Sequence, residues 1–242
     1  MMDVFLVIAV FSVVQSLFGV GLLVFGTPTL LLLGYSLEEC LVFLLPSSVT
    51  ISLLQLATLR STRSALASEF HVWCLPVLLG CLLLRLTSGI AAQLEVLMAA
   101  VLLAGAVTTI SPRLRAEVGR LLLRNRPLYL SAMGAVHGVS NMGGSMLTVY
   151  AHAVASDKEA ILKTTAFGNL FFALVQLATI AALRGDLFAP EMAVLPAASA
   201  AIYWTLGRSI FAATSQGGYR ALLGSIMTAY GALLMWRGFS VL

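Results

Sequence analysis

Two short stretches of the chain combine residue types that can bind a small ligand without a charged side chain. Residues 17–28 are rich in glycine, and residues 137–145 combine glycine with serine, asparagine and histidine. Such residues interrupt helices and free backbone amides, and glycine lets a ligand approach those amides closely. Because helix N-termini carry partial positive charge, the two breaks predict a binding site for a small anion.

The candidate binding residues lie in the two breaks and in the helices that follow them. We predict that the anion contacts Gly19, Gly21, Gly26, Thr27 and Ser48 in the first half of the chain, and His137, Ser140, Asn141, Gly143, Gly144, Ser145 and Asn169 in the second. The alternative is that the small residues serve only close helix packing. His137 either donates to the anion, carries a coupling proton or is structural. Gln55 and Gln176 either bridge helices or line the path.

The composition places these breaks inside a membrane. Of the 242 residues, 60% are hydrophobic and 10% are charged, whereas a soluble domain has about 25% charged residues. Long apolar runs, rather than alternating strands, predict helices. At about 20 residues per crossing, little of the chain is left for a soluble domain. The predicted fold class is therefore an all-α polytopic membrane protein.

Two of the eight uncharged stretches differ from the rest in length. Six have the length of one helix, but residues 4–37 and 128–156 are too long for one simple crossing, and each contains a break. Each is either a long kinked helix or a re-entrant hairpin. The hairpin topology places eleven of the fourteen basic residues on the cytoplasmic side, against nine for the kinked helices, so the positive-inside rule favours hairpins, with both termini outside.

An internal repeat divides the chain. The heptapeptide LLQLATL at residues 53–59 recurs as LVQLATI at residues 174–180, 121 residues later. We predict a first transmembrane repeat at residues 1–110, a basic cytoplasmic connector at 111–127 and a second repeat at 128–242. Each repeat comprises a broken helical hairpin and three transmembrane helices. Because the hairpins enter from opposite sides, the repeats are inverted, which is typical of secondary transporters.

Motifs for other functions are not found. The chain has no HExxH, GxSxG or Walker A motif and no Cys/His spacing for a metal, so we predict no enzyme, no catalytic residue, no metal site and no cofactor. The cysteines are interpreted as buried apolar residues. The basic connector faces anionic lipid, and no nucleic acid is expected as a partner.

The two broken segments resemble the signatures of the sulfite exporter TauE/SafE family of membrane permeases. The first likeness is carried by QSLFGVG at residues 15–21 and FGTPTL at 25–30, and the second by GAVHGVSNMGGS at 134–145 with Tyr150 after it. The resemblance covers essentially the whole chain. It implies transport of sulfite, sulfonates or other small organic anions, often as export from the bacterial cytoplasm. Ser145 stands where the family often has proline, and its hydroxyl either adds a ligand contact or loosens the turn.

These patterns together predict a secondary transporter that exports a small sulfur-containing or organic anion across the bacterial inner membrane. The alternatives are an importer of another small organic anion and a membrane scaffold or assembly factor that transports nothing. The expected partners are the anion, the lipid bilayer and a coupling proton. Small residues at Ala197 and Ala201, and at Gly224 and Ala232, also suggest a homodimer.

Overall fold

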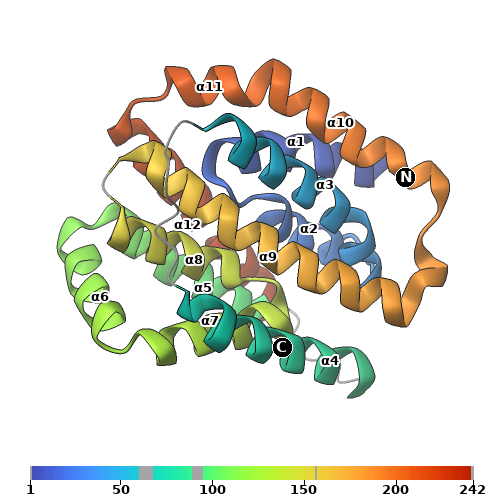
Figure 1. Cartoon of the computed structure of the whole chain (residues 1–242), viewed down its shortest axis with the longest axis horizontal. Helices are drawn as coiled ribbons and strands as arrows, with labels where there is room; N and C mark the ends of the chain where they lie inside the picture. Colours follow the sequence, from blue (N-terminus) through green and yellow to red (C-terminus); the bar gives the residue numbers. More distant parts are fainter. Residues whose placement is uncertain (1, 60–67, 89–94, 156, 241–242) are drawn as a thin grey trace. The chain divides into compact units, whose positions relative to one another are not determined.

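The computed structural model describes residues 2–59, 68–88, 95–155 and 157–240, and every regular element in these ranges is helical (Figure 1). No strand occurs in this described part of the chain, which confirms the predicted all-α fold. The helices form two compact units. Unit 1 comprises Met1–Ser64 and Leu162–Ala213, and unit 2 comprises Ala65–Ile161 and Thr214–Leu242.

The membrane character predicted from composition agrees with the helix lengths. In the described ranges, three helices are long and apolar enough to cross a membrane: Leu37–Thr58, Phe70–Ser88 and Lys158–Leu187. A fourth membrane-spanning element results if Val96–Ile110 and Pro112–Arg124, between which the chain bends by 112°, are counted as one broken span. The sequence predicts six full spans, so the number of crossings and the sidedness of the loops stay predictions. Arg60 and Arg63, which contribute to that sidedness, lie outside the described residues.

Unit 1 contains the first broken segment. Its elements are α1 (Met2–Phe18), a π-helix (Leu22–Gly26), α2 (Thr27–Leu32), α3 (Leu37–Thr58), most of α9 (Lys158–Arg184), 3₁₀ turns at Gly185–Leu187 and Pro190–Ala193, α10 (Val194–Ile202), a second π-helix (Tyr203–Gly207) and α11 (Arg208–Ala213). A capping box between Ser36 and Glu39 begins α3. The buried hydroxyls of Ser12 in α1 and Ser199 in α10 are 2.9 Å apart and hydrogen-bonded, and α10 packs beside α1 (Figure 1).

Helices α3 and α9 run antiparallel within unit 1. Near the start of α3, Glu38 forms an ion pair with Arg184 at the end of α9. Further along α3, Ser48 accepts a hydrogen bond from Asn169 in the middle of α9. Residue numbers therefore rise along one helix as they fall along the other.

Unit 2 contains the second broken segment. Its elements are a π-helix (Phe70–Cys74), α4 (Leu75–Ser88), α5 (Glu95–Ile110), α6 (Pro112–Arg124), α7 (Arg126–Ser140), α8 (Gly143–Val154) and α12 (Gln216–Ser240). A Cβ atom on Gly134 would lie 2.3 Å from the carbonyl oxygen of Cys74, and one on Gly138 would lie 2.5 Å from that of Leu78. These two glycines, four residues apart on α7, therefore let its backbone touch α4 and the π-helix before it.

Helices α5 and α12 form the second antiparallel pair. A Cβ atom on Gly224 would lie 2.4 Å from Ile110, and one on Gly231 would lie 2.7 Å from Leu103. The end of α5 thus packs near the start of α12, and the middle of α5 packs further along α12. The small surface at Gly224 is covered by Ile110 of the same chain, and a homodimer stays a prediction.

Both long uncharged segments double back on themselves. In the first, the Tyr35 hydroxyl, just after α2, donates a 2.7 Å hydrogen bond to Asp3 in the first turn of α1. In the second, the Tyr129 hydroxyl in the first turn of α7 donates a 2.7 Å hydrogen bond to the Met146 carbonyl in α8. The Tyr129 ring also stacks on Tyr150, with centroids 6.5 Å apart. The start of each segment therefore lies beside a later part of the same segment, as in a hairpin.

The order of the elements follows the 121-residue spacing of the repeated heptapeptide. Helix α3 begins at Leu37 and α9 at Lys158, and α5 begins at Glu95 and α12 at Gln216. The two compact units nevertheless do not follow chain order, because unit 1 joins α1–α3 to α9–α11, and unit 2 joins α4–α8 to α12. The repeat boundaries at residues 110 and 128 stay a prediction about the sequence.

Candidate functional site

The first break lies between α1 and the π-helix that follows it. Gly19 has φ +75°, in the left-handed region that favours glycine. A Cβ atom there would lie 3.0 Å from the backbone nitrogen of Ala166 and 3.0 Å from Cβ of Thr165, both in α9. Gly19 therefore permits both the turn and the close approach of the break to α9.

The backbone groups freed by this break are satisfied by two glutamine side chains. Gln15 in α1 accepts a 3.2 Å hydrogen bond from the amide of Leu22, the first residue after the break. Gln55 in α3 donates to the carbonyls of Gln15 and Ser16, at 2.7 Å and 3.1 Å. Gln55 therefore bridges helices, as one of the two interpretations of this residue predicts. Gln15 is not among the predicted binding residues, although a carboxamide four residues before a glycine break could have indicated its role.

Ser48 and Asn169, which the 121-residue register aligns, meet in unit 1. The Asn169 amide donates to the hydroxyls of Ser48 and Ser52, at 3.0 Å and 3.2 Å. Gln15 donates to the Ser48 hydroxyl as well, at 3.0 Å. All four side chains are fully buried. The structure thus joins two predicted binding residues to the glutamine that holds the break.

Three polar atoms of this region are buried without a hydrogen-bond partner. They are the Ser47 hydroxyl, Oε1 of Gln55 and Oδ1 of Asn169. A buried polar group without a hydrogen-bond partner destabilises the folded state by about 1–3 kcal/mol, so native proteins rarely leave such a group without one. These atoms therefore indicate a place where unit 1 accommodates a polar ligand or water.

Two of the predicted residues in the first segment have packing contacts. A Cβ atom on Gly26 would lie 3.0 Å from Cδ2 of Leu44 in α3, and one on Gly21 would lie 2.5 Å from the backbone nitrogen of Gln15. Thr27 is fully buried, and its carbonyl faces the Cys40 thiol at 4.0 Å. These contacts favour the packing interpretation for Gly21 and Gly26.

The second break separates α7 from α8 by two residues. Asn141 has φ 63°, in the left-handed region. Its backbone amide donates a 2.9 Å hydrogen bond to the carbonyl of His137, so Asn141 ends α7 as a left-handed C-cap. The Ser140 hydroxyl donates to the carbonyl of Val136 at 2.7 Å, within its own helix. The hydroxyl of Ser140 is therefore engaged by α7.

Gly143, at the start of α8, lets α7 and α8 approach each other closely. A Cβ atom on Gly143 would lie 2.4 Å from Cβ of His137, which is fully buried. Gly144 is also buried, and its carbonyl accepts a 2.9 Å hydrogen bond from Thr148. Gly143 is thus required for the fold of the second break, and His137 lies directly against it.

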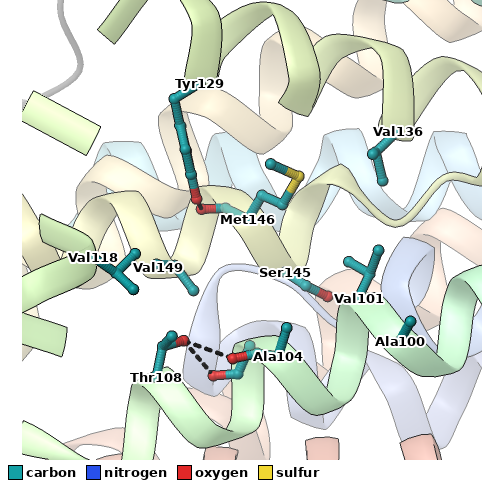
Figure 2. A pocket seen from close by; sticks show the side chains of 11 residues that line it. Ala100, Val101, Ala104, Thr108, Val118, Tyr129, Val136, Ser145, Met146 and Val149 are labelled. Carbon is teal, nitrogen blue, oxygen red and sulfur yellow. Dashed lines mark hydrogen bonds between the residues drawn. The ribbon is translucent and has the colours of Figure 1, made fainter. Parts of the chain in front are cut away.

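Ser145, in the first turn of α8, differs from these residues. Its hydroxyl is buried, only 1% of the residue is exposed, and the oxygen has no hydrogen-bond partner. It lines a cavity of about 460 Å³ (Figure 2). The other cavity-lining residues are contributed by α5, α6, α7 and α8 and are mostly apolar: Ala100, Val101, Ala104, Gly105, Thr108, Val118, Tyr129, Val136, Met146 and Val149.

The other polar groups of this cavity are already engaged. The Thr108 hydroxyl is hydrogen-bonded to the carbonyls of Ala104 and Gly105, at 3.0 Å and 2.9 Å (Figure 2). The Tyr129 hydroxyl is engaged by Met146. Among the residues that line the cavity, Ser145 therefore has the hydroxyl without a hydrogen-bond partner. It lies in the first turn of α8, where the partial positive charge of the helix dipole is strongest.

The chain was compared with family models, curated proteins and solved structures. None of them matches it. Among the described residues, no three His, Cys, Asp or Glu side chains group as a metal site. The functional interpretation therefore rests on the sequence patterns and on the two breaks described above.

Proposed function

We propose that this protein is a secondary transporter of a small organic anion, with the two broken segments as re-entrant hairpins that bind it. The observation that carries the proposal is that both segments double back around a buried break. Irregular backbone is tolerated at membrane depth only where protein or a watery cavity satisfies it. Broken helices of this kind bind substrates in many transporters.

The orientation of the helices supports inverted repeats. Helices α3 and α9 correspond at a spacing of 121 residues, as do α5 and α12. Both pairs are antiparallel within their units. Side-by-side helices related by a two-fold axis in the membrane plane run in opposite directions, as the inverted topology requires.

The proposed ligand contacts are the polar groups that the fold leaves uncommitted. In unit 2, the Ser145 hydroxyl donates to the anion at the N-terminus of α8. Unit 1 offers a second, separate candidate contact: the Asn169 carboxamide supplies a donor there once it turns by 180° about its Cβ–Cγ bond, which exchanges its O and N. The Ser52 hydroxyl, 3.2 Å from the amide nitrogen in the present orientation, then donates to the Asn169 oxygen.

The cavity at Ser145 bears on the class of substrate. Its lining is almost entirely apolar, and a bare inorganic anion gains nothing from such a surface. An anion with an apolar part, such as a sulfonate, fits both the Ser145 hydroxyl and the apolar wall. This supports the sulfonates over sulfite among the substrates that the TauE/SafE resemblance implies. We further propose export across the bacterial inner membrane, with His137 as the carrier of a coupling proton.

Binding and transport assays test the proposal. Purified protein is titrated with sulfite, alkanesulfonates and carboxylates while the unfolding temperature is measured, and counterflow uptake is then followed in proteoliposomes. We expect a sulfonate to raise the unfolding temperature of the intact protein, and Ser145→Ala, Asn141→Ala and Gly144→Leu to reduce that response. Thr108→Val is the matched control, because it removes a cavity-lining hydroxyl that is already engaged.

A membrane scaffold is the competing function, and one observation favours it. Gly134, Gly138 and Gly143 all permit close backbone approaches, which helix packing alone explains. A response to carboxylates but not to sulfonates would instead favour the importer alternative. If no anion stabilises the intact protein or exchanges in counterflow, the transporter proposal is wrong and the scaffold is preferred.

A further inference from the structure

Helix α6 differs from α5, which precedes it, in both direction and composition. Helix α5 has no charged side chain after Glu95, which is typical of a segment that crosses a membrane. The chain then bends by 112° into α6, which begins at Pro112 and contains four arginines. Since this bend is not far from a right angle, α6 lies near the plane of the membrane when α5 crosses it. Helices in that plane are commonly amphipathic and basic.

The two sides of α6 have different surroundings. On one side Gly119 is buried, and a Cβ atom there would lie 3.4 Å from Cβ of Ala153 in α8. Arg113, Arg120 and Arg124 are exposed, and their spacings of seven and four residues place them on one stripe of the helix. None of these three arginines forms an ion pair with a carboxylate of the described residues. The exposed stripe therefore has positive charge that no described side chain neutralises through an ion pair.

A hollow of about 470 Å³ lies on this exposed side of α6, and it is lined by Glu117, Arg120, Leu121 and Arg124. Arg120 and Arg124 are one helical turn apart, so their guanidinium groups can donate to the same phosphate group. Leu121, which is 61% exposed, lies beside them, and Leu114, two turns earlier on the same side, is 39% exposed. Exposed leucines next to arginines suit a ligand that has an apolar part as well as an anionic group.

The charges around the hollow restrict the ligand further. Two guanidinium groups and one carboxylate leave a single net positive charge, which a ligand with one net negative charge neutralises. The carboxylate of Glu117 only accepts hydrogen bonds, so a ligand that contacts it needs a hydroxyl or another donor. A phosphodiester between a hydroxyl-bearing headgroup and acyl chains has all of these properties, as in phosphatidylglycerol.

We propose that the exposed side of α6 binds a phosphatidylglycerol molecule of the surrounding bilayer. The phosphodiester oxygens accept from Arg120 and Arg124, a glycerol hydroxyl donates to Glu117, and an acyl chain lies along Leu121. The composition of the connector predicts only that it faces anionic lipid, whereas the hollow assigns one lipid to named side chains. The site is independent of the proposed transport function, because neither break contributes a residue to it.

The first test counts the lipids that the full-length protein retains from nanodiscs, by native mass spectrometry. The discs consist of phosphatidylcholine with equal small fractions of phosphatidylglycerol and phosphatidylethanolamine. We expect preferential retention of phosphatidylglycerol, and a loss of roughly five-fold in that retention in Arg120→Gln or Arg124→Gln. Arg113→Gln is the matched control, because Arg113 is exposed on the same stripe but is not among the residues that line the hollow.

A second pair of lipids tests the hydrogen bond to Glu117. Phosphatidylmethanol has the same net charge as phosphatidylglycerol but no headgroup hydroxyl, so we expect the intact protein to retain less of it. Glu117→Ala removes the acceptor while keeping a good helix-forming residue, and this variant is expected to retain the two lipids equally. All four residues that line the hollow are exposed, so these substitutions should leave the unfolding temperature in lipid-free detergent unchanged.

Three results would overturn the proposal. The first is equal retention of phosphatidylglycerol and phosphatidylethanolamine by the intact protein. The second is an Arg120→Gln or Arg124→Gln variant that retains phosphatidylglycerol as well as Arg113→Gln does, since the positive charge of the stripe would then act without a specific site. The third is equal retention of phosphatidylglycerol and phosphatidylmethanol by the intact protein, which would leave the headgroup hydroxyl without a role.

Discussion

The two broken segments differ in how the backbone groups freed at each break are hydrogen-bonded. In the first, side chains of neighbouring helices satisfy the break: Gln15 accepts from the Leu22 amide, and Gln55 donates to the last carbonyls of α1. In the second, the break is capped by its own backbone through Asn141, and the following helix begins with the uncommitted hydroxyl of Ser145 beside a cavity. The first break is held by the core, whereas the second leaves a donor available.

The largest expected effect is on the core that holds the first break. Gln15→Ala removes the acceptor of the Leu22 amide and a partner of Ser48, so we expect the free energy of unfolding to fall by about 2–4 kcal/mol. Equilibrium unfolding in detergent micelles measures it. A loss no greater than that caused by Ser145→Ala would contradict the difference between the two breaks.

The second break depends on the absence of a side chain rather than on the presence of one. Gly143→Ala places a Cβ atom 2.4 Å from that of His137, and we expect it to lower the free energy of unfolding by about 1–3 kcal/mol. Gly80→Ala is the control, since nothing lies within 4 Å of a Cβ atom there; inside α4 it should stabilise by about 0.5–1 kcal/mol. Two variants of equal stability would show that α7 and α8 are not closely packed at Gly143.

A pair of serine variants separates an engaged hydroxyl from an uncommitted one. Ser48→Ala removes a hydroxyl shared by Gln15 and Asn169 and should cost about 1–2 kcal/mol. Ser145→Ala removes a buried hydroxyl without a partner and should therefore raise the free energy of unfolding of the ligand-free protein, by about 1 kcal/mol. If the ranking is reversed, Ser145 has a structural partner and loses its role in the comparison.

The smallest effect concerns the hydrogen bond that joins the ends of the first segment. Hydrogen bonds, of which the one from the Tyr35 hydroxyl is the strongest, lower the pKa of Asp3 to about 2, below the value of about 3.9 in an unfolded chain. A lowered pKa contributes stability that is present above the unfolded value and lost as the pH falls through the folded value. We therefore expect the unfolding temperature to fall between about pH 4 and pH 2, and Tyr35→Phe to reduce that fall. An unchanged profile in Tyr35→Phe would show that the two residues do not interact.

The positions of the breaks were predictable from the sequence because their cause is local. Glycine in the left-handed region at residue 19 and asparagine at residue 141 end α1 and α7, where the clusters of helix-breaking residues indicate. Ser48 and Asn169 were both predicted as binding residues, and they occupy equivalent positions in the repeat; the hydrogen bond between them was not predicted.

What the sequence could not predict depends on residues far away along the chain. Whether Gly26 binds a ligand or packs is decided by Leu44, on α3. The cavity at Ser145 joins side chains from four helices, none of which has a pattern of its own. Small residues have the same appearance in a sequence whether they face a ligand or a neighbouring backbone.

The interleaving of the two compact units also determines the order in which the protein can fold during synthesis. Ser12 is 187 residues from its partner Ser199, and Ser48 is 121 residues from Asn169. When α1–α3 leave the ribosome, the helices that complete their core have not yet been made. The polar side chains of the first broken segment therefore lack partners until α9 and α10 are made, whereas α4 and α7 of unit 2 can pair earlier. In a nascent chain stopped before residue 158, we accordingly expect the second broken segment to be better protected from proteolysis than the first.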